Sequence, residues 1–437
     1  MWRGALLRWQ RMAEAADDPP PSAPLPAVWR QRNYMLLWTG QVVSSLGSGM
    51  TAFALPLLVM ASTGSPLVAG MAGALYWLPY ALFSLPAGAL MDRWNRKRVM
   101  IACDAVRAIN IATVPLALAA GRLTVPQIYV NAFIEGSCYV LFNIAEVAAL
   151  SRVVDKRQLS YAAAQNEATF ALVGLISPSL GGFLYKSVSA AFPFVVDAIS
   201  YTASVFTLSL INIRFQSERT AAPIALGSSI KEGLRWLWSR PLIRTMAFVT
   251  GALNVVFTGS TLAILVLARD HGADPRTIGL MFSITGLGGV VGAIAAGPIS
   301  RRLSFAQAIL GSIWVNVAVF PITLLAPNPY VVGAVNAIVC ATGPLYNVVQ
   351  FSYRLALIPD ELQGRVNSAF RLLALGSQPL GAALAGVLLE ELGAGTTIAI
   401  FSAGYLMIGV LASLAEPIRK ARPIAEVRPA ATSPAAR

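Results

Sequence analysis

The sequence predicts an all-α membrane protein with twelve transmembrane helices, and three observations predict it. Of the 437 residues, 56% are hydrophobic and only 12% are charged, whereas charged residues make up about 25% of a soluble domain. The apolar residues form runs long enough to cross a bilayer as a helix, which takes about 20 residues. These runs are too continuous for membrane β-strands, which alternate over about ten residues.

Twelve runs of the required length follow one another along the chain. Because twelve is an even number, both chain ends are expected on the same side of the membrane. The runs are residues 36–61, 66–90, 99–119, 125–148, 162–185, 191–213, 245–267, 278–298, 306–325, 330–351, 369–389 and 397–414.

The basic residues predict the orientation of these runs. Cytoplasmic loops of membrane proteins collect Lys and Arg. With the N-terminus inside, the cytoplasmic segments hold 27 of the 33 Lys and Arg, the external loops hold four, and two lie within the runs. We therefore expect a multi-pass protein of the cell membrane with both termini in the cytoplasm.

A long polar segment divides the twelve runs six and six. Its stretch SSIKEGLRWLWSRP places Ile230, Leu234, Leu237 and Trp238 at helical spacing, which predicts an amphipathic helix on the membrane face. The expected organisation is a cytoplasmic tail (1–33), a six-helix bundle (34–213), a cytoplasmic linker (214–244), a second six-helix bundle (245–415) and a disordered cytoplasmic tail (416–437).

Composition and motifs exclude several classes of function. The net charge is +13, but the bases stand in short groups between apolar runs, which argues against nucleic-acid binding. Three cysteines far apart in apolar runs and a single histidine predict no metal site. No G-x-x-x-x-G-K-[ST] loop is present, so an ATP-driven pump is not expected. The sequence contains no catalytic cluster and no cofactor motif, so an enzyme is not expected.

Two stretches indicate that the halves are duplicated. Asn166 to Pro178 reads NEATFALVGLISP, and Asn367 to Pro379 reads NSAFRLLALGSQP. The Asn, the Ala two residues later and the Pro twelve residues later recur in both. Their positions in corresponding runs favour two pseudo-symmetric halves, as in many transporters.

The hinge between the second and third runs carries a recognisable pattern. GALMDRWNRKR resembles the loop G-x-x-x-D-R-x-G-R-R/K of the major facilitator superfamily. Asn95 replaces the second glycine, a mild departure because Asn tolerates the backbone of a tight turn. The matching residues are Gly88, Asp92, Arg93, Arg96 and Lys97.

Further stretches resemble particular branches of that superfamily. GLISPSLGG is similar to the G-P-x-x-G-G motif on the fifth helix of drug antiporters, with Ser177 in place of a glycine. IPDELQGRVNS and DAVRA look like the branch that contains the enterobactin exporter and macrolide efflux proteins. The resemblance covers about residues 30 to 415. The antiporter-type positions are Gly174, Pro178, Gly181 and Gly182.

The resemblance implies a fold and a function. It implies two six-helix bundles around a cavity that opens alternately to either side, lined by the first, fourth, seventh and tenth helices. The third, sixth, ninth and twelfth helices would be peripheral. The expected function is export of an amphipathic drug, macrolide or siderophore in exchange for protons, by a monomer. An importer or lipid flippase of the same fold is the alternative.

The resemblance also implies a latch at the hinge. Asp92 would meet the start of the eleventh helix, where Arg365 adds an opposite charge, and Arg96 would bridge towards Glu146. The simpler interpretation is that the hinge bases only fix orientation. Glu146 would then be an interfacial carboxylate that reaches water.

Charges inside the runs need a partner or a function, because each costs about 2.5–3.5 kcal/mol at the bilayer centre. Asp104 and Arg107, three residues apart, are expected to form a structural ion pair. Asp197 is expected to be a structural partner as well. Glu135 lies midway along the fourth helix with no base within a turn, which makes it the candidate for proton coupling. The alternative is a protonated or hydrogen-bonded glutamate that holds helix contacts.

Polar residues on the expected cavity helices are the substrate-binding candidates, although any of them could instead pack between helices. Two departures bear on proton coupling: Ser48 stands where relatives in this branch often carry an acid, and the arginine typical of the fourth helix of other drug antiporters is absent. The candidates are Gln41, Ser44, Ser48, Asn131, Asn254, Asn336, Tyr346, Asn347 and Gln350.

Overall fold

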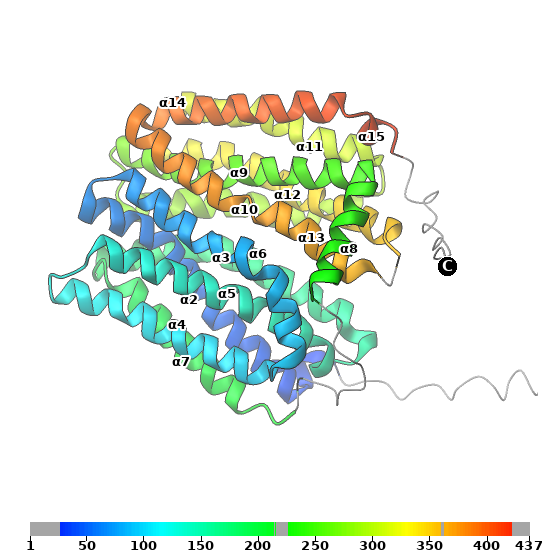
Figure 1. Cartoon of the computed structure of the whole chain (residues 1–437). Coiled ribbons are helices and arrows are strands. Elements are labelled where there is room, and N and C mark those ends of the chain that lie inside the picture. Colours follow the sequence, from blue (N-terminus) through cyan, green and yellow to red (C-terminus); the bar gives the residue numbers. More distant parts are fainter. Residues whose placement is uncertain (1–26, 214, 216–225, 360–361, 422–437) are drawn as a thin grey trace, which may run out of the picture.

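The computed structural model describes residues 27–213, 215, 226–359 and 362–421, and this part of the chain contains helices and no strand (Figure 1). The helices fall into two bundles, with the short helix α8 at one end of the molecule. The two expected tails fall largely on residues 1–26 and 422–437, which lie outside the described part. Within it, Glu416–Arg419 form the short helix α15, where the sequence predicted the start of a disordered tail.

Six long helices make up the first bundle, and each coincides with one of the apolar runs. Ser65 and Thr124 cap the helices that begin after them, because their side chains accept a hydrogen bond from the first turn. The helices are α2 (Arg32–Thr63), α3 (Pro66–Arg93), α4 (Arg96–Ala119), α5 (Val125–Val153), α6 (Leu159–Ser187) and α7 (Phe192–Ser209), with η1 (Val28–Arg30) and η2 (Lys156–Gln158) beside them.

The second bundle also has six crossings, although its last two are continuous in α14. Gly393 has φ 73° and ψ 175° inside that element, so the chain bends there and begins a twelfth crossing. The twelve predicted crossings are therefore confirmed. The elements are α9 (Pro241–Asp270), α10 (Pro275–Ser300), α11 (Phe305–Val319) with η3 (Phe320–Leu325), α12 (Pro329–Leu357), α13 (Gln363–Leu375) and α14 (Gln378–Leu414).

The molecule has two ends. We call the end that carries the described chain termini and α8 the terminal face, and the opposite end the distal face (Figure 1). Within the described part, positive φ values occur only at Gly64, Gly121, Gly272 and Gly393. All four lie in turns of the distal face, where the chain reverses between two crossings. Glycine fits there because it has no Cβ to clash in the left-handed region.

Two helix pairs make the main contacts between the bundles: α3 with α14, and α6 with α10. At the first pair, a Cβ on Gly70 would lie 2.5 Å from the Cα of Gly386. At the second, a Cβ on Gly182 would lie 2.2 Å from the Pro275 carbonyl oxygen. Small residues let membrane helices approach this closely. Both of these close approaches lie in the distal half, and α13 adds a smaller contact with α3.

The predicted amphipathic helix is confirmed as α8 (Leu226–Ser239). It lies across the terminal face and packs mainly on α13 (Figure 1). Leu237 is fully buried against the second bundle, while Trp238 on the adjacent side is 56% exposed. The helix therefore has one face on the protein and an aromatic side chain free to meet the membrane surface.

Candidate functional site

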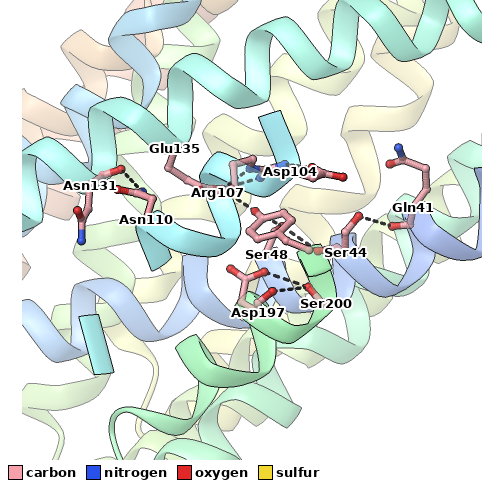
Figure 2. A network of polar contacts seen from close by, with 11 residues as sticks. Gln41, Ser44, Ser48, Asp104, Arg107, Asn110, Asn131, Glu135, Asp197 and Ser200 are labelled. Carbon is pink, nitrogen blue, oxygen red and sulfur yellow. Dashed lines mark hydrogen bonds and ion pairs between the residues drawn. The ribbon is translucent and has the colours of Figure 1, made fainter. Parts of the chain in front are cut away.

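The first bundle contains a buried cluster of charged side chains between α4, α5 and α7 (Figure 2). Its centre is an ion pair between Arg107 of α4 and Glu135 of α5. Both Nε and Nη2 of Arg107 lie 2.6 Å from the same oxygen, Oε1 of Glu135. Arg107 is 5% exposed and Glu135 is 7% exposed. Charge-assisted hydrogen bonds this short are among the strongest that proteins form.

A chain of hydroxyl groups runs from this ion pair to α2. The Tyr201 hydroxyl of α7 donates to Glu135 Oε1 at 2.5 Å, and it lies 2.7 Å from Ser48 Oγ. Ser48 in turn donates to the Ser44 carbonyl at 2.8 Å. The Arg107 guanidinium also stacks 4.1 Å from the centre of the Tyr201 ring, a favourable cation–π arrangement. Arg107 and Tyr201 thus bind the Glu135 carboxylate directly, and Ser48 of α2 is linked to it through the Tyr201 hydroxyl.

Two further acids lie in the same buried region. Asp104, one turn before Arg107, has an oxygen 3.7 Å from Arg107 Nη1, and neither of its oxygens has a hydrogen-bond partner. Asp197, one turn before Tyr201, accepts from Ser200 at 3.3 Å through Oδ1, while Oδ2 has no partner. Both carboxyl groups are fully buried. In Figure 2 both lie close to the ion pair.

The charges of this cluster do not balance if every acid is ionised. Three buried carboxyl groups, Asp104, Glu135 and Asp197, share one buried guanidinium. Removing an unpaired carboxylate from water costs several kcal/mol, so such a group takes up a proton instead. Asp104 and Asp197 lack a hydrogen bond to the guanidinium, and Oε2 of the paired Glu135 also has no partner, so each of the three acids has an oxygen that a proton can occupy. The arrangement can therefore bind and release protons.

The local fold explains why these side chains meet. The helices α4 and α5 form a hairpin around the turn at Gly121, and Arg107 and Glu135 are almost equally far from that turn. Antiparallel neighbours place such positions at the same depth. One turn nearer the distal face, Asn110 donates to the Asn131 carbonyl at 3.0 Å. This second contact fixes the register of the hairpin.

The structure confirms one expectation about these charges and corrects another. The expected ion pair of Asp104 with Arg107 is present at 3.7 Å, although the hydrogen bonds of Arg107 go to Glu135. Glu135 was expected to be a lone carboxylate with no base within a turn of its own helix, but Arg107 of the neighbouring helix provides one. Sequence reasoning missed this pairing and the contribution of Tyr201, because it compared charges only along one helix. The equal spacing from the hairpin turn is the signal that could have revealed Arg107.

Four of the predicted cavity residues lie in the first bundle, and most already have partners. Ser48 belongs to the hydroxyl chain. Asn131 donates to Thr113 Oγ1 at 3.0 Å, and Ser44 donates to the Gln41 carbonyl at 3.3 Å. The Nε2 atom of Gln41 has no partner in the described part of the chain. Gln41 is therefore the member of this group whose amide nitrogen is unsatisfied, and that nitrogen is buried.

Five predicted cavity residues lie in the second bundle. The Tyr346 hydroxyl lies 2.7 Å from Thr250 Oγ1, and Gln350 Nε2 donates to the same oxygen at 2.7 Å. Both side chains are buried and tie α12 to α9. Asn347, between them in sequence, is exposed. These residues thus divide into a structural pair and an accessible amide.

The two other asparagines of this group are engaged within the second bundle. Asn254 donates to the Ala374 carbonyl at 2.6 Å, which links α9 to α13. Asn336 is 4% exposed and donates to Thr323 Oγ1 at 3.2 Å. A ligand would have to displace these bonds, since a buried amide left without partners is costly.

Two of the hinge bases bind backbone carbonyls at helix ends. Arg96 donates to the carbonyls of Ala148 and Phe215 at 3.2 and 3.3 Å. Lys97 donates to the Ile211 carbonyl at 2.6 Å, just beyond α7. Positive groups close the carbonyl ends of helices favourably. These bases therefore hold the terminal ends of α5 and α7 beside the hinge.

The remaining hinge residues are less informative. Arg93 is exposed. The side-chain surroundings of Gly88 and Asp92 lie outside the described part, so the role expected of Asp92 stays a prediction. In the described part no ion pair joins Arg96 to Glu146, which is 8% exposed. The expected bridge between those two is thus not made in this structure.

The expected neighbour of Asp92 on the eleventh helix has another partner here. Arg365, in the first turn of α13, forms an ion pair with Glu232 of α8. A Cβ on Gly233 would lie 2.5 Å from the Arg365 carbonyl oxygen, so the two helices touch closely. The linker helix is thereby attached to the start of the eleventh crossing.

The antiporter-type motif lies where α6 meets α10. A Cβ on Gly279 of α10 would lie 2.4 Å from the Pro178 carbonyl oxygen, and one on Gly286 would lie 2.8 Å from the Gly174 carbonyl oxygen. Gly182 makes the approach to Pro275 described above. Gly181 faces the other way, towards Met50 of α2. The motif therefore builds one of the two contacts between the bundles.

Twelve crossings in two six-helix bundles, with a buried charge cluster in one bundle, define a membrane transporter of the major facilitator type. The model of the transmembrane secretion effector family, part of that superfamily, matches residues 22–434. The chain therefore belongs to this family. Its members are transporters rather than enzymes, and the resemblance seen in the hinge and in the fifth helix is confirmed.

Two curated proteins that are similar to this chain are named as efflux proteins. The multidrug efflux pump Tap of Mycolicibacterium fortuitum is 27% identical over 402 residues, which cover 88% of this chain and 96% of that protein. Macrolide efflux protein A of Streptococcus pyogenes is 22% identical over 403 residues, which cover 90% of this chain and 98% of that protein. The chain thus matches these relatives over nearly their whole length.

Solved structures show the same fold. The nucleoside transporter NupG has a TM-score of 0.68 at 15% identity, with 89% of this chain and 100% of that chain covered. A bacterial homologue of the iron transporter ferroportin, in an inward-facing state, has a TM-score of 0.67 at 15% identity, with 89% and 99% covered. At this identity the likeness establishes the fold alone.

Proposed function

We propose that this protein exports amphipathic small molecules of the drug, macrolide or siderophore type from the cytoplasm in exchange for protons. Two relatives that match it from end to end are named as multidrug and macrolide efflux proteins. The observation that carries the coupling is the charge balance of the buried cluster between α4, α5 and α7. Three buried acids share one arginine, so protons must accompany them whenever water is excluded.

Glu135 is the proton-coupling residue in this proposal. Its Oε1 is held by Arg107 and Tyr201, and its Oε2 is open. Ser48 occupies the place where relatives of this branch often carry an acid on the first helix. Here the hydroxyl chain Ser48–Tyr201 brings the α5 carboxylate to that same region. Glu135 would thus supply the proton-binding group that the first helix lacks.

The substrate would bind between the bundles, which rock to expose it to either side in turn. The remaining polar candidates are Asn347, which is exposed, and Gln41, whose buried Nε2 lacks a partner, whereas the other predicted cavity residues have partners inside a bundle. The proposed division of the chain is 34–213 and 245–415, joined by the linker 214–244. We propose that the transporter works as a monomer, because each chain has both bundles.

The terminal face is cytoplasmic in this proposal, because the expected topology assigns 27 of the 33 Lys and Arg to the cytoplasmic segments. Single cysteines at position 220, in the expected cytoplasmic linker, and at position 271, on the distal face, test it in intact cells with a membrane-impermeant thiol reagent. Only the cysteine that replaces His271 should react. Reaction at position 220 without reaction at 271 would reverse the topology.

Transport in purified vesicles tests the function. A panel of fluorescent drugs, a macrolide and a siderophore is offered to vesicles of one orientation, with and without an imposed proton gradient. The proposal expects uphill movement of at least one compound towards the distal side, only with the gradient. Movement of labelled phospholipid instead would favour a flippase, and movement towards the terminal side would favour an importer.

A further inference from the structure

A carboxylate of the second bundle caps the start of a helix in the first bundle. Glu390, near the distal end of the eleventh crossing, accepts through Oε2 from the Ser65 hydroxyl at 2.8 Å and from the Leu67 backbone N–H at 3.2 Å. Ser65 is the N-cap of α3, and Leu67 lies in its first turn. Both donors therefore belong to the N-terminus of one helix.

The contact is favourable for two physical reasons. The N-terminal N–H groups of a helix have no partner within the helix, and Glu390 satisfies one of them. The N-terminus also carries a partial positive charge, which a nearby carboxylate stabilises. Ser65 simultaneously accepts from the Val68 N–H at 3.3 Å. The carboxylate of one bundle is therefore integrated into the cap of the other.

The backbones of α3 and α14 approach each other closely beside this contact. A Cβ on Gly70 would lie 2.5 Å from the Gly386 Cα, and one on Gly73 would lie 3.3 Å from the Ala382 Cβ. These positions continue along α3 and α14 directly from the Glu390 contact. The carboxylate thus sits at the distal end of a tight glycine-lined seam, where separation of the bundles would begin.

We propose that Glu390 is a latch that holds the distal side of the transporter closed. It is the counterpart of the latch expected of Asp92. Asp92 lies at the end of the second crossing and is expected to meet the start of the eleventh. Glu390 lies at the end of the eleventh crossing and caps the start of the second. The inference rests on the alternating access of the proposed function. Opening the distal side breaks the Glu390 bonds and exposes the α3 N-terminus to water.

The second seam has a matching contact at the same end. Arg276, in the first turn of α10, donates to the Ser187 hydroxyl at the end of α6 at 2.6 Å. That bond joins a neutral hydroxyl to an exposed guanidinium, whereas Glu390 joins a carboxylate to two donors at a helix N-terminus. The Glu390 contact therefore differs from it in placing a negative charge at a helix N-terminus, where the helix dipole favours it.

Distance measurements between spin labels test the latch directly. Labels are placed at cysteines that replace Arg122 and His271, on distal turns of the first and second bundles, in the full-length protein without its native cysteines. Double electron–electron resonance then reports the closed and open populations. The free energy lost with a helix cap corresponds to about a fivefold change in an equilibrium constant, here that between the closed and the open distal side. Glu390→Ala should therefore raise the open population about fivefold, and Glu390→Gln should raise it less.

The neighbouring Glu391→Ala is the matched control, because Glu391 is an exposed acid with no partner in the described part of the chain. It should leave the distance distribution unchanged. A wild-type distribution in Glu390→Ala would overturn the latch, and so would an equal shift in Glu391→Ala. The readout needs neither a substrate nor a proton gradient. If proton coupling is disproved, the latch can still be confirmed by this measurement. If the latch is disproved, proton coupling is unaffected.

Discussion

Arg107 and Glu135 form a buried ion pair between two antiparallel helices, with two guanidinium nitrogens 2.6 Å from one carboxylate oxygen. The pair leaves the second carboxylate oxygen of Glu135 without a partner. It also leaves Asp104, 3.7 Å from Arg107, without a hydrogen bond. The Arg107 guanidinium is thus shared unequally between two carboxyl groups. Whether Glu135 is ionised or protonated decides how much of the guanidinium charge is available to Asp104.

Removing Arg107 should destabilise the protein. Arg107→Gln leaves buried carboxyl groups without their cation, and breaking a buried pair in this way costs about 3–5 kcal/mol. We expect the thermal unfolding midpoint in detergent to fall by several degrees. The double variant Arg107→Gln, Glu135→Gln removes both charges and should recover most of that loss. Simple addition of the two single effects would mean that the pair is not coupled.

The α6–α10 seam should not tolerate a larger residue at Gly279. A Cβ there would lie 2.4 Å from the Pro178 carbonyl oxygen, and overpacking costs about 1–3 kcal/mol. Gly279→Ala should therefore weaken the distal contact between the bundles and lower vesicle export severalfold. Gly297→Ala on the same helix is the control, because a Cβ at Gly297 meets nothing within 4 Å. Equal export by both variants would show that the seam can yield without cost.

The hinge base Lys97 should contribute to stability through the end of α7. Its Nζ lies 2.6 Å from the Ile211 carbonyl oxygen, and a cation at a helix C-terminus is worth about 0.3–1 kcal/mol. Lys97→Ala should lower the free energy of unfolding by that amount. Arg98→Ala, which removes an exposed base of the same hinge, should not. Both variants remove one charge, so a similar loss in both would mean that net charge, not the carbonyl contact, matters.

The sequence was sufficient for the crossings but not for the pairing of charges. Apolar runs of bilayer length located all twelve helices, and Gly393 shows why the last two are continuous in secondary structure yet separate as crossings. The amphipathic spacing around Leu237 located α8. These features depend on local composition, which one sequence displays in full.

The site depends on contacts between helices, which a single sequence does not display. Glu135 was selected correctly as a buried acid of the fourth helix, but its partners Arg107 and Tyr201 lie on helices that the family resemblance had assigned to the periphery. Arg365 was assigned to Asp92 but meets Glu232 of the linker. The latch role of Asp92 and the coupling role of Glu135 stay predictions.

The measurement that tests proton coupling most directly compares uphill export with substrate exchange in vesicles that contain the Glu135→Gln variant. If Glu135 carries the coupled proton, the variant should lose export driven by a proton gradient by at least about tenfold, while it still exchanges labelled for unlabelled substrate. Exchange survives because the substrate still binds and the bundles still move. Glu167→Gln, which changes an exposed acid in the third turn of α6, should behave like the wild type in both assays. Unchanged gradient-driven export in Glu135→Gln would contradict the account.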